Sequence, residues 1–150
     1  MKNESCTMRE ALPQIMAQFA AGFSVSIHPQ GTSMQPMLYA NRDSVVLSPI
    51  PEACKKNDVI LYVRPNGQFV LHRIIAIQNH AYVCRGDHQF VKEYPVPHEN
   101  VLAVVTAFTR NGKYVETSRW TYRLYCFLWP AVHPALRTLA TVKRRLFSRL

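Results

Sequence analysis

Between residues 24 and 110 the chain consists of short apolar or alternating runs, separated by residues that favour turns. The runs read SVSI, SVVLS, DVILYV, QFVLHRIIAI, AYVCR and VLAVVTAF. Segments this short, rich in Val and Ile and bounded by Gly, Pro, Asn and Asp, are typical of strands. Asn66-Gly67 supplies the positive φ angles that a tight hairpin needs, which predicts that DVILYV pairs with QFVLHRII. We therefore expect a compact, mainly β domain with these six strands.

Both flanks of this region have helical patterns. Over residues 9–23 apolar side chains recur at spacings of three and four, and Pro13 fits only in the first turn of such a helix. The last third is rich first in aromatic and then in basic residues, and it holds a second apolar face: Leu136, Leu139, Ala140, Val142 and Leu146. We divide the chain into an N-terminal amphipathic helix (1–23), a β domain (24–116) and an aromatic, basic helical tail (117–150).

The positive charge is concentrated in the tail. The chain has 18 Lys and Arg against 9 Asp and Glu, and residues 117–150 contain no acid. The cations of the tail are Arg119, Arg123, Arg137, Lys143, Arg144, Arg145 and Arg149. They follow or flank the aromatic residues Trp120, Tyr122, Tyr125, Phe127 and Trp129. This order fits peripheral contact with a membrane surface and equally a packed helix with a solvated basic end. Nucleic-acid binding is disfavoured because no recognition motif accompanies the cations.

Several other classes of protein are disfavoured by composition. A domain of 150 residues buries enough surface to fold without metal or disulfides. The cysteines, at positions 6, 54, 84 and 126, form no CxxC pair, so we expect neither a metal site nor a compact disulfide framework. The nearest candidate for a spanning helix, the uncharged apolar run over residues 124–136, is too short to span a bilayer, and we expect no apolar signal segment at the start of the chain. We expect a cytoplasmic or peripherally membrane-associated protein.

Two residues could carry nucleophilic chemistry. Ser33 follows the first predicted strand in the turn GTSMQPML, where a hydroxyl can be presented to a ligand. His72 interrupts an apolar strand, and a nucleophilic serine needs such a base to take its proton. Each residue also has an ordinary structural reading, Ser33 as a turn residue and His72 as a half-exposed strand residue.

The order of four short motifs resembles the signal peptidase I superfamily of serine peptidases. The motifs are GTSMQP, NDVILY, VLHRI and RGDHQ, and they lie between residues 25 and 105. A histidine in H-R-I resembles the endoplasmic-reticulum and archaeal branch, whereas the bacterial branch uses lysine. Because the N-terminal segment is short and polar-faced, we expect it not to act as the N-terminal membrane anchor that is usual in the family. The resemblance implies a signal-peptidase/LexA-like β fold and a serine endopeptidase that processes a signal, leader or precursor peptide without a cofactor.

By this resemblance Ser33 is the nucleophile, His72 the general base and Asp87 the third catalytic residue. The RGDHQ box departs from the G-D-N pattern of the family, so Glu93 is the alternative to Asp87. Asp58 matches the acidic start of the second strand, or serves its turn.

Around the nucleophile, Met34 and Pro36 would shape the turn, and Thr32 and backbone amides would hold the oxyanion. The expected partner is a peptide or preprotein. A catalytically inactive module attached to a membrane through the tail is the alternative function. A self-cleaving repressor is disfavoured by His72 at the base position and by the lack of room for a DNA-binding domain.

Overall fold

The computed structural model describes residues 7–147, except for the side chains of residues 136, 137 and 139–147. In order along the chain the elements are α1 (Met8–Ala20), β1 (Val25–Ile27), β2 (Ser44–Ser48), β3 (Val59–Val63), β4 (Phe69–Gln78), β5 (Ala81–Arg85), β6 (Glu93–Val96), a 3-10 turn (His98–Asn100), β7 (Val101–Arg110), β8 (Lys113–Glu116) and α2 (Trp120–Phe147). The prediction of a mainly β chain with a short N-terminal helix and a C-terminal helix is confirmed. The chain divides into two compact units, residues 1–115 and 116–150, so α1 belongs with the sheet.

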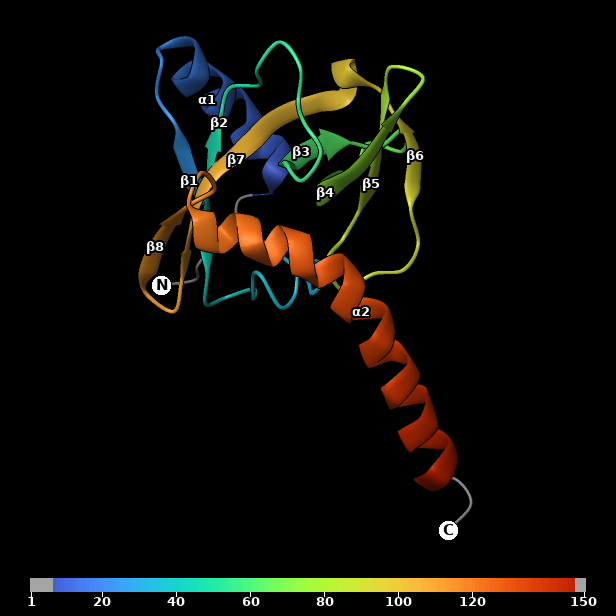
Figure 1. Cartoon of the computed structure of the whole chain (residues 1–150). Helices are drawn as coiled ribbons and strands as arrows, with labels where there is room; N and C mark the ends of the chain where they lie inside the picture. The colour runs from blue at the N-terminus through green and yellow to red at the C-terminus, as the bar shows by residue number, and fades with distance from the viewer. Residues whose placement is uncertain (1–6, 148–150) are drawn as a thin grey trace. The chain divides into compact units, whose positions relative to one another are not determined.

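The eight strands of the described residues form one sheet in the order β1-β2-β7-β3-β4-β5-β6, and β8 pairs with β7. Every neighbouring pair along this order is antiparallel. The long strand β7, gold in Figure 1, pairs with β2 along one stretch and with β3 along another. It thereby joins the β1–β2 hairpin to the β3–β4–β5 meander, and the two halves of the site come from these two parts.

Burial of the strands follows their sequence patterns. In SVVLS of β2 only Val45 and Leu47 are buried, because alternate side chains of a strand point to opposite faces. In VILYV of β3, which lies between β7 and β4, the first four residues are buried, so side chains on both faces of this strand are covered. The core cluster around β3 is made of Cys54, Ile60, Tyr62, Val70, Ile74, Tyr82, Cys84, Val96, Val101 and Val104.

Two strands were missing from the sequence prediction. β6 contains Pro95 and lies at the edge of the sheet, where a proline removes no internal ladder bond. β8 is the return strand of a hairpin whose turn, Asn111-Gly112, has positive φ at both residues (51° and 73°). All six predicted strands are present, and the described residues form eight strands where six were predicted.

Two local predictions are corrected by the backbone. The β3–β4 hairpin forms as expected, but only Gly67 has a positive φ, at 80°. Its amide donates to the Arg64 carbonyl at 2.8 Å, as in a type I turn that ends in a left-handed glycine; Pro65 fits the first central position of that turn. In α1 the cap is Thr7, whose hydroxyl accepts from Glu10, so Pro13 lies beyond the first turn.

The tail forms α2 with Pro130 and Pro134 inside the helix. The predicted late apolar face and the cations from Arg137 onward lie outside the side chains that the structure describes. Cys6 also lies outside the described residues, whereas Cys54, Cys84 and Cys126 are buried and are not joined in disulfides. Within residues 7–147 no helix has the length and apolar character needed to cross a membrane.

Candidate active site

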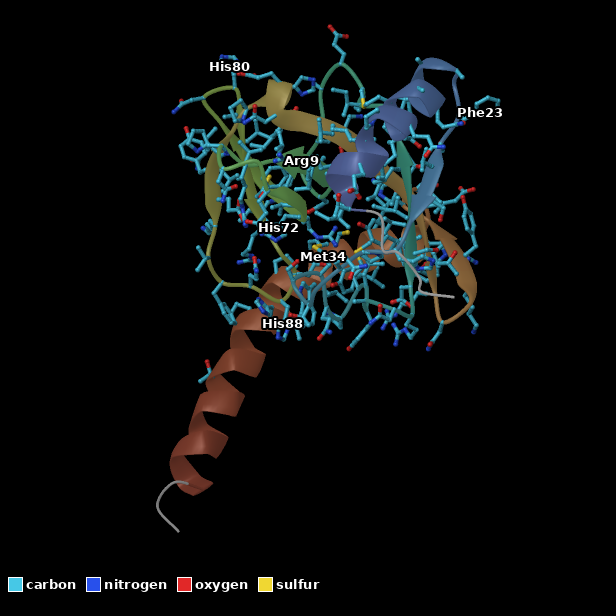
Figure 2. The ribbon with its side chains drawn as sticks, turned by 180° about the vertical axis from the view of Figure 1, so that it is seen from behind. Arg9, Phe23, Met34, His72, His80 and His88 are labelled. Carbon is cyan, nitrogen blue, oxygen red and sulfur yellow. The ribbon has the colours of Figure 1, made fainter. Side chains whose placement is uncertain are left out.

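A cavity of about 420 Å³ in the first unit is lined by both predicted chemical residues, Ser33 and His72. One wall is the connection after β1, from Pro29 to Met34, and the other is the start of β4, from Gln68 to His72. Leu38, Ala40, Arg64 and Gln89 complete the lining. Figure 2 labels one residue from each wall, Met34 and His72. Segments separated by more than thirty residues thus form one site.

The connection that carries Ser33 is closed by the buried carboxylate of Asp43, which is 0% exposed. The carboxylate accepts from the backbone amide of Tyr39 at 2.8 Å and from that of Asn111 at 3.2 Å. Arg42 donates to it as well, and this hydrogen bond is the main reason that the pKa of Asp43 is lowered to about 2. Asp43 therefore stays charged and ties the β1–β2 connection to the β7–β8 turn.

Ser33 is held at its backbone by the segment after β5. The amide of His88 donates to the Ser33 carbonyl at 2.9 Å. A Cβ on Gly86 would lie 2.5 Å from the same carbonyl oxygen, which is closer than real Cβ contacts allow. Only glycine fits this approach. The Ser33 hydroxyl, on a half-buried side chain, makes no hydrogen bond to any residue in the described part of the chain.

His72 is 2% exposed, and two groups meet its Nδ1 atom. The Tyr62 hydroxyl and the Glu93 Oε1 atom each lie 3.3 Å from Nδ1. Tyr62 in turn donates to Glu93 Oε2 at 2.7 Å. A carboxylate beside Nδ1 favours the tautomer with the proton on that nitrogen, and leaves the lone pair on Nε2. Nε2 makes no hydrogen bond to any residue among 7–147, and His72 is one of the residues that line the cavity.

The charges around His72 fit a neutral imidazole beside an ionised carboxylate. Burial lowers the pKa of His72, against the opposing effect of the Glu93 charge. Hydrogen bonds from the Arg64 side chain to Glu93 lower the pKa of that carboxyl. Burial and the Glu93 carboxylate raise the pKa of Tyr62, which keeps its proton. At neutral pH the group therefore consists of neutral His72, neutral Tyr62, anionic Glu93 and cationic Arg64.

Asp87, expected as the third catalytic residue, has a different partner. It is 3% exposed and forms a two-pronged ion pair with Arg73, with N to O distances of 2.7 Å from both Nε and the terminal nitrogen. Arg73 also donates to the Asn57 carbonyl at 3.0 Å and contacts the sulfur of Met37 at 3.1 Å. The residue beside the His72 ring is Glu93, the alternative left open by the sequence, and Asp87 supports the Gly86 segment.

The remaining predicted residues fall into two groups. Met34 is 4% exposed, and with the exposed Thr32 it lines the cavity; Pro36 is half-buried in the same turn. Asp58 closes its own turn, because its carboxylate accepts from the Lys55 amide at 2.7 Å. For Asp58 the structure thus supplies the turn role of the two that the sequence allowed.

Sequence reasoning missed Tyr62, Arg64 and Arg73. Tyr62 and Arg64 are two residues apart at the end of β3, and residues at this spacing in a strand point to the same face. A tyrosine hydroxyl and an arginine on one face could have indicated a polar site. Arg73 lies in an apolar strand, and a buried arginine needs a carboxylate partner. Its neighbour across the ladder is another arginine, Arg85, so the strand pairing alone does not indicate that partner.

No residue cluster of the described chain with three or more His, Cys, Asp or Glu side chains has a geometry that could hold a metal ion. Comparison of the chain with protein-family models, with curated proteins and with solved structures finds no match.

Proposed function

We propose that the protein is a serine endopeptidase of the signal-peptidase type, which cleaves a signal, leader or precursor peptide by a Ser-His mechanism. The observation that carries the proposal is that one cavity is lined both by Ser33, whose hydroxyl makes no hydrogen bond within the described residues 7–147, and by His72, whose Nδ1 atom meets a carboxylate. An imidazole that holds its proton on Nδ1 has the tautomer that a general base needs at Nε2.

In the proposed reaction the Ser33 hydroxyl oxygen attacks a peptide carbonyl, and His72 Nε2 takes the hydroxyl proton. The imidazolium that forms is stabilised by the Glu93 carboxylate. It then gives the proton to the leaving amine, whose departure leaves an ester on Ser33. Water, deprotonated by the same nitrogen, hydrolyses the ester and regenerates the serine. In free enzymes the catalytic hydrogen bonds are often long and tighten when substrate binds, so a free hydroxyl on Ser33 is compatible with this route.

The edge of β4 supports an extended peptide as the substrate. β5 pairs with β4 only from Arg73 onward, whereas β3 covers the other side of the strand from Phe69 to Arg73. The Arg64 amide donates to the Gln68 carbonyl, and the Ile74 amide donates to that of Asp58. Bonded pairs alternate along an antiparallel ladder.

By this alternation, the backbone groups of Phe69 and Leu71 point away from β3, toward the side where the cavity lies. A substrate strand can pair with these groups as an added strand of the sheet. It would bring its peptide bond between the wall that holds Ser33 and the wall that holds His72.

The test is acylation of the purified chain by a serine-directed probe, such as a fluorophosphonate, read by intact mass and peptide mapping. We expect one adduct on Ser33, absent in Ser33→Ala and strongly reduced in His72→Ala. Matched controls are Ser26→Ala and His80→Ala, both at exposed positions away from the cavity, and these should react like the parent. An unreactive, folded parent protein, or an adduct that persists in Ser33→Ala, would contradict the proposal and favour a binding module.

A further inference from the structure

The helix α2 exposes several large apolar side chains along one of its sides. Trp120 is 71% exposed and Phe127 78% exposed. The others are Leu124, Leu128 and Val132, which are 46%, 47% and 44% exposed. Their spacings of three and four residues place them along one side of the helix. We call these five residues the apolar stripe.

The opposite side of the same helix carries buried and mostly aromatic side chains. Tyr122, Cys126 and His133 are buried, and their spacings of four and seven residues correspond to about one and two helical turns. Tyr125 stacks on Tyr122 and on Trp129, with ring centroids 6.3 and 5.8 Å apart, and Trp129 contacts His133. The aromatic side chains of α2 thus divide into a contacted side and an exposed side, and the stripe belongs to the second.

The charge of the segment decides which partner fits the stripe. Arg119 and Arg123 are exposed at the end of the helix where the stripe begins, and residues 117–150 contain no acid. A protein partner or a second copy of this helix would have to supply all the compensating negative charge. A lipid surface with anionic headgroups supplies it along the whole helix, and arginine side chains can reach headgroups while their methylene stems stay at the apolar boundary.

We propose that α2 is an interfacial membrane-binding helix, which inserts the apolar stripe among the acyl chains of an anionic bilayer and lies parallel to its surface. A stripe from Trp120 to Val132 is about 18 Å long at the rise of an α-helix, which suits a helix lying in the interface. Trp and Phe at the boundary and cations toward the headgroups are the features that such helices share. The inference rests on α2 and stands whether or not the first unit is a peptidase.

The experiment is flotation of the full chain with vesicles of phosphatidylcholine, with and without phosphatidylglycerol. We expect binding to the anionic vesicles, weak binding to the neutral ones, and a reduction of about tenfold in the partition coefficient for Phe127→Ala. Phe23→Ala is the matched control, because Phe23 is also a solvent-facing phenylalanine, 61% exposed and at the outer edge of the first unit in Figure 2. It should bind like the parent.

Tryptophan fluorescence locates the contact. A blue shift on binding should persist in Trp129→Phe and be lost in Trp120→Phe, because only Trp120 belongs to the stripe. Folding of each variant is checked by circular dichroism.

Three results would overturn the proposal. They are failure of the folded parent to bind anionic vesicles, equal binding by Phe127→Ala and the parent, and a lipid-free dimer in ultracentrifugation that Phe127→Ala dissociates. The last would assign the stripe to a second copy of the chain.

Discussion

Two carboxylate–arginine pairs lie on neighbouring parts of the same sheet and differ in what surrounds them. In the Asp87–Arg73 pair both side chains are nearly inaccessible, at 3% and 4% exposure. In the Glu93–Arg64 pair the exposures are 23% and 30%, and Tyr62 and His72 join the group. The first pair is buried, and its charged groups make hydrogen bonds inside the protein. The second is next to a cavity and adjusts the protonation of a histidine. The comparison teaches that the carboxylate of the Gly86-Asp87 turn is taken up by Arg73, whereas the carboxylate beside His72 comes from Glu93 on another strand.

The largest expected difference between the pairs is in stability. Arg73→Met leaves the Asp87 carboxylate buried without its partner, and removing one member of a buried pair costs about 3–5 kcal/mol. Arg64→Met leaves Glu93 with Tyr62 and solvent, and should cost about 1 kcal/mol or less. Urea denaturation of both variants measures the difference.

A double variant tests whether the loss is due to the unpaired charge. Asp87→Asn combined with Arg73→Met should recover part of the stability lost in Arg73→Met, because no buried charge remains. Equal losses for Arg73→Met and Arg64→Met would remove the distinction between the two pairs.

The second difference is in reactivity. Glu93→Gln removes the charge that stabilises the imidazolium, so acylation of Ser33 should slow by about a hundredfold, with the fold retained. Because Glu93 raises the pKa of His72, the acid limb of the rate profile should also move to lower pH in this variant. Asp87→Asn, assayed on the folded fraction, should slow the reaction by less than about tenfold. A larger loss for Asp87→Asn than for Glu93→Gln would return the third catalytic role to Asp87.

A smaller effect is expected from Tyr62→Phe, which removes the hydroxyl between His72 and Glu93 without removing either charge. We expect acylation to slow by roughly tenfold or less, and the free energy of unfolding to fall by about 1 kcal/mol through the lost hydrogen bond. A role limited to packing would leave the pH profile unmoved, whereas a positioning role shifts it. Stopped-flow acylation across pH separates the two.

The smallest effect is the dependence of stability on pH. Burial lowers the pKa of His72 below its ordinary 6.5, so the unfolded chain binds the proton more readily. Stability should therefore be complete above pH 6.5 and fall on acidification down to the lowered pKa, by less than about 1.4 kcal/mol per pH unit. In His72→Gln this slope should vanish. Thermal denaturation between pH 5 and 8 provides the comparison, and an unchanged slope in the variant would assign it to other groups.

Much of the fold follows from local pattern, because apolar runs and turn residues act over a few positions. Local pattern also predicts Ser33 and His72 as candidates, the first by its turn and the second as a polar residue in an apolar strand. The choice between Asp87 and Glu93 could not be made locally. It depends on the pairing of β6 with β5, which puts Glu93 opposite Cys84, and β6 was not recognised because of Pro95.

Two omissions had usable signals in the sequence. Asn111-Gly112 is the same hairpin dipeptide as Asn66-Gly67, and it is the pair with positive φ at both positions. The second signal is the polar end groups of Tyr62 and Arg64, which lie on one face at the end of β3 and the start of its turn. By contrast, the sequence does not indicate which aromatic side chains of α2 are buried and which are exposed. Tyr122 is buried and Phe127 is exposed, although both belong to the same aromatic segment.

The unpaired edge of β4 has a consequence for the timing of the proposed reaction. In the proposed reaction, a strand edge beside a cavity of about 420 Å³ would take one extended segment and would leave no room for a folded element. A compact precursor would therefore be cut only after the segment around its scissile bond had come loose. For such a precursor the observed rate would report how often that segment opens, and the same peptidase would act quickly on a nascent or newly released chain and slowly on the finished one.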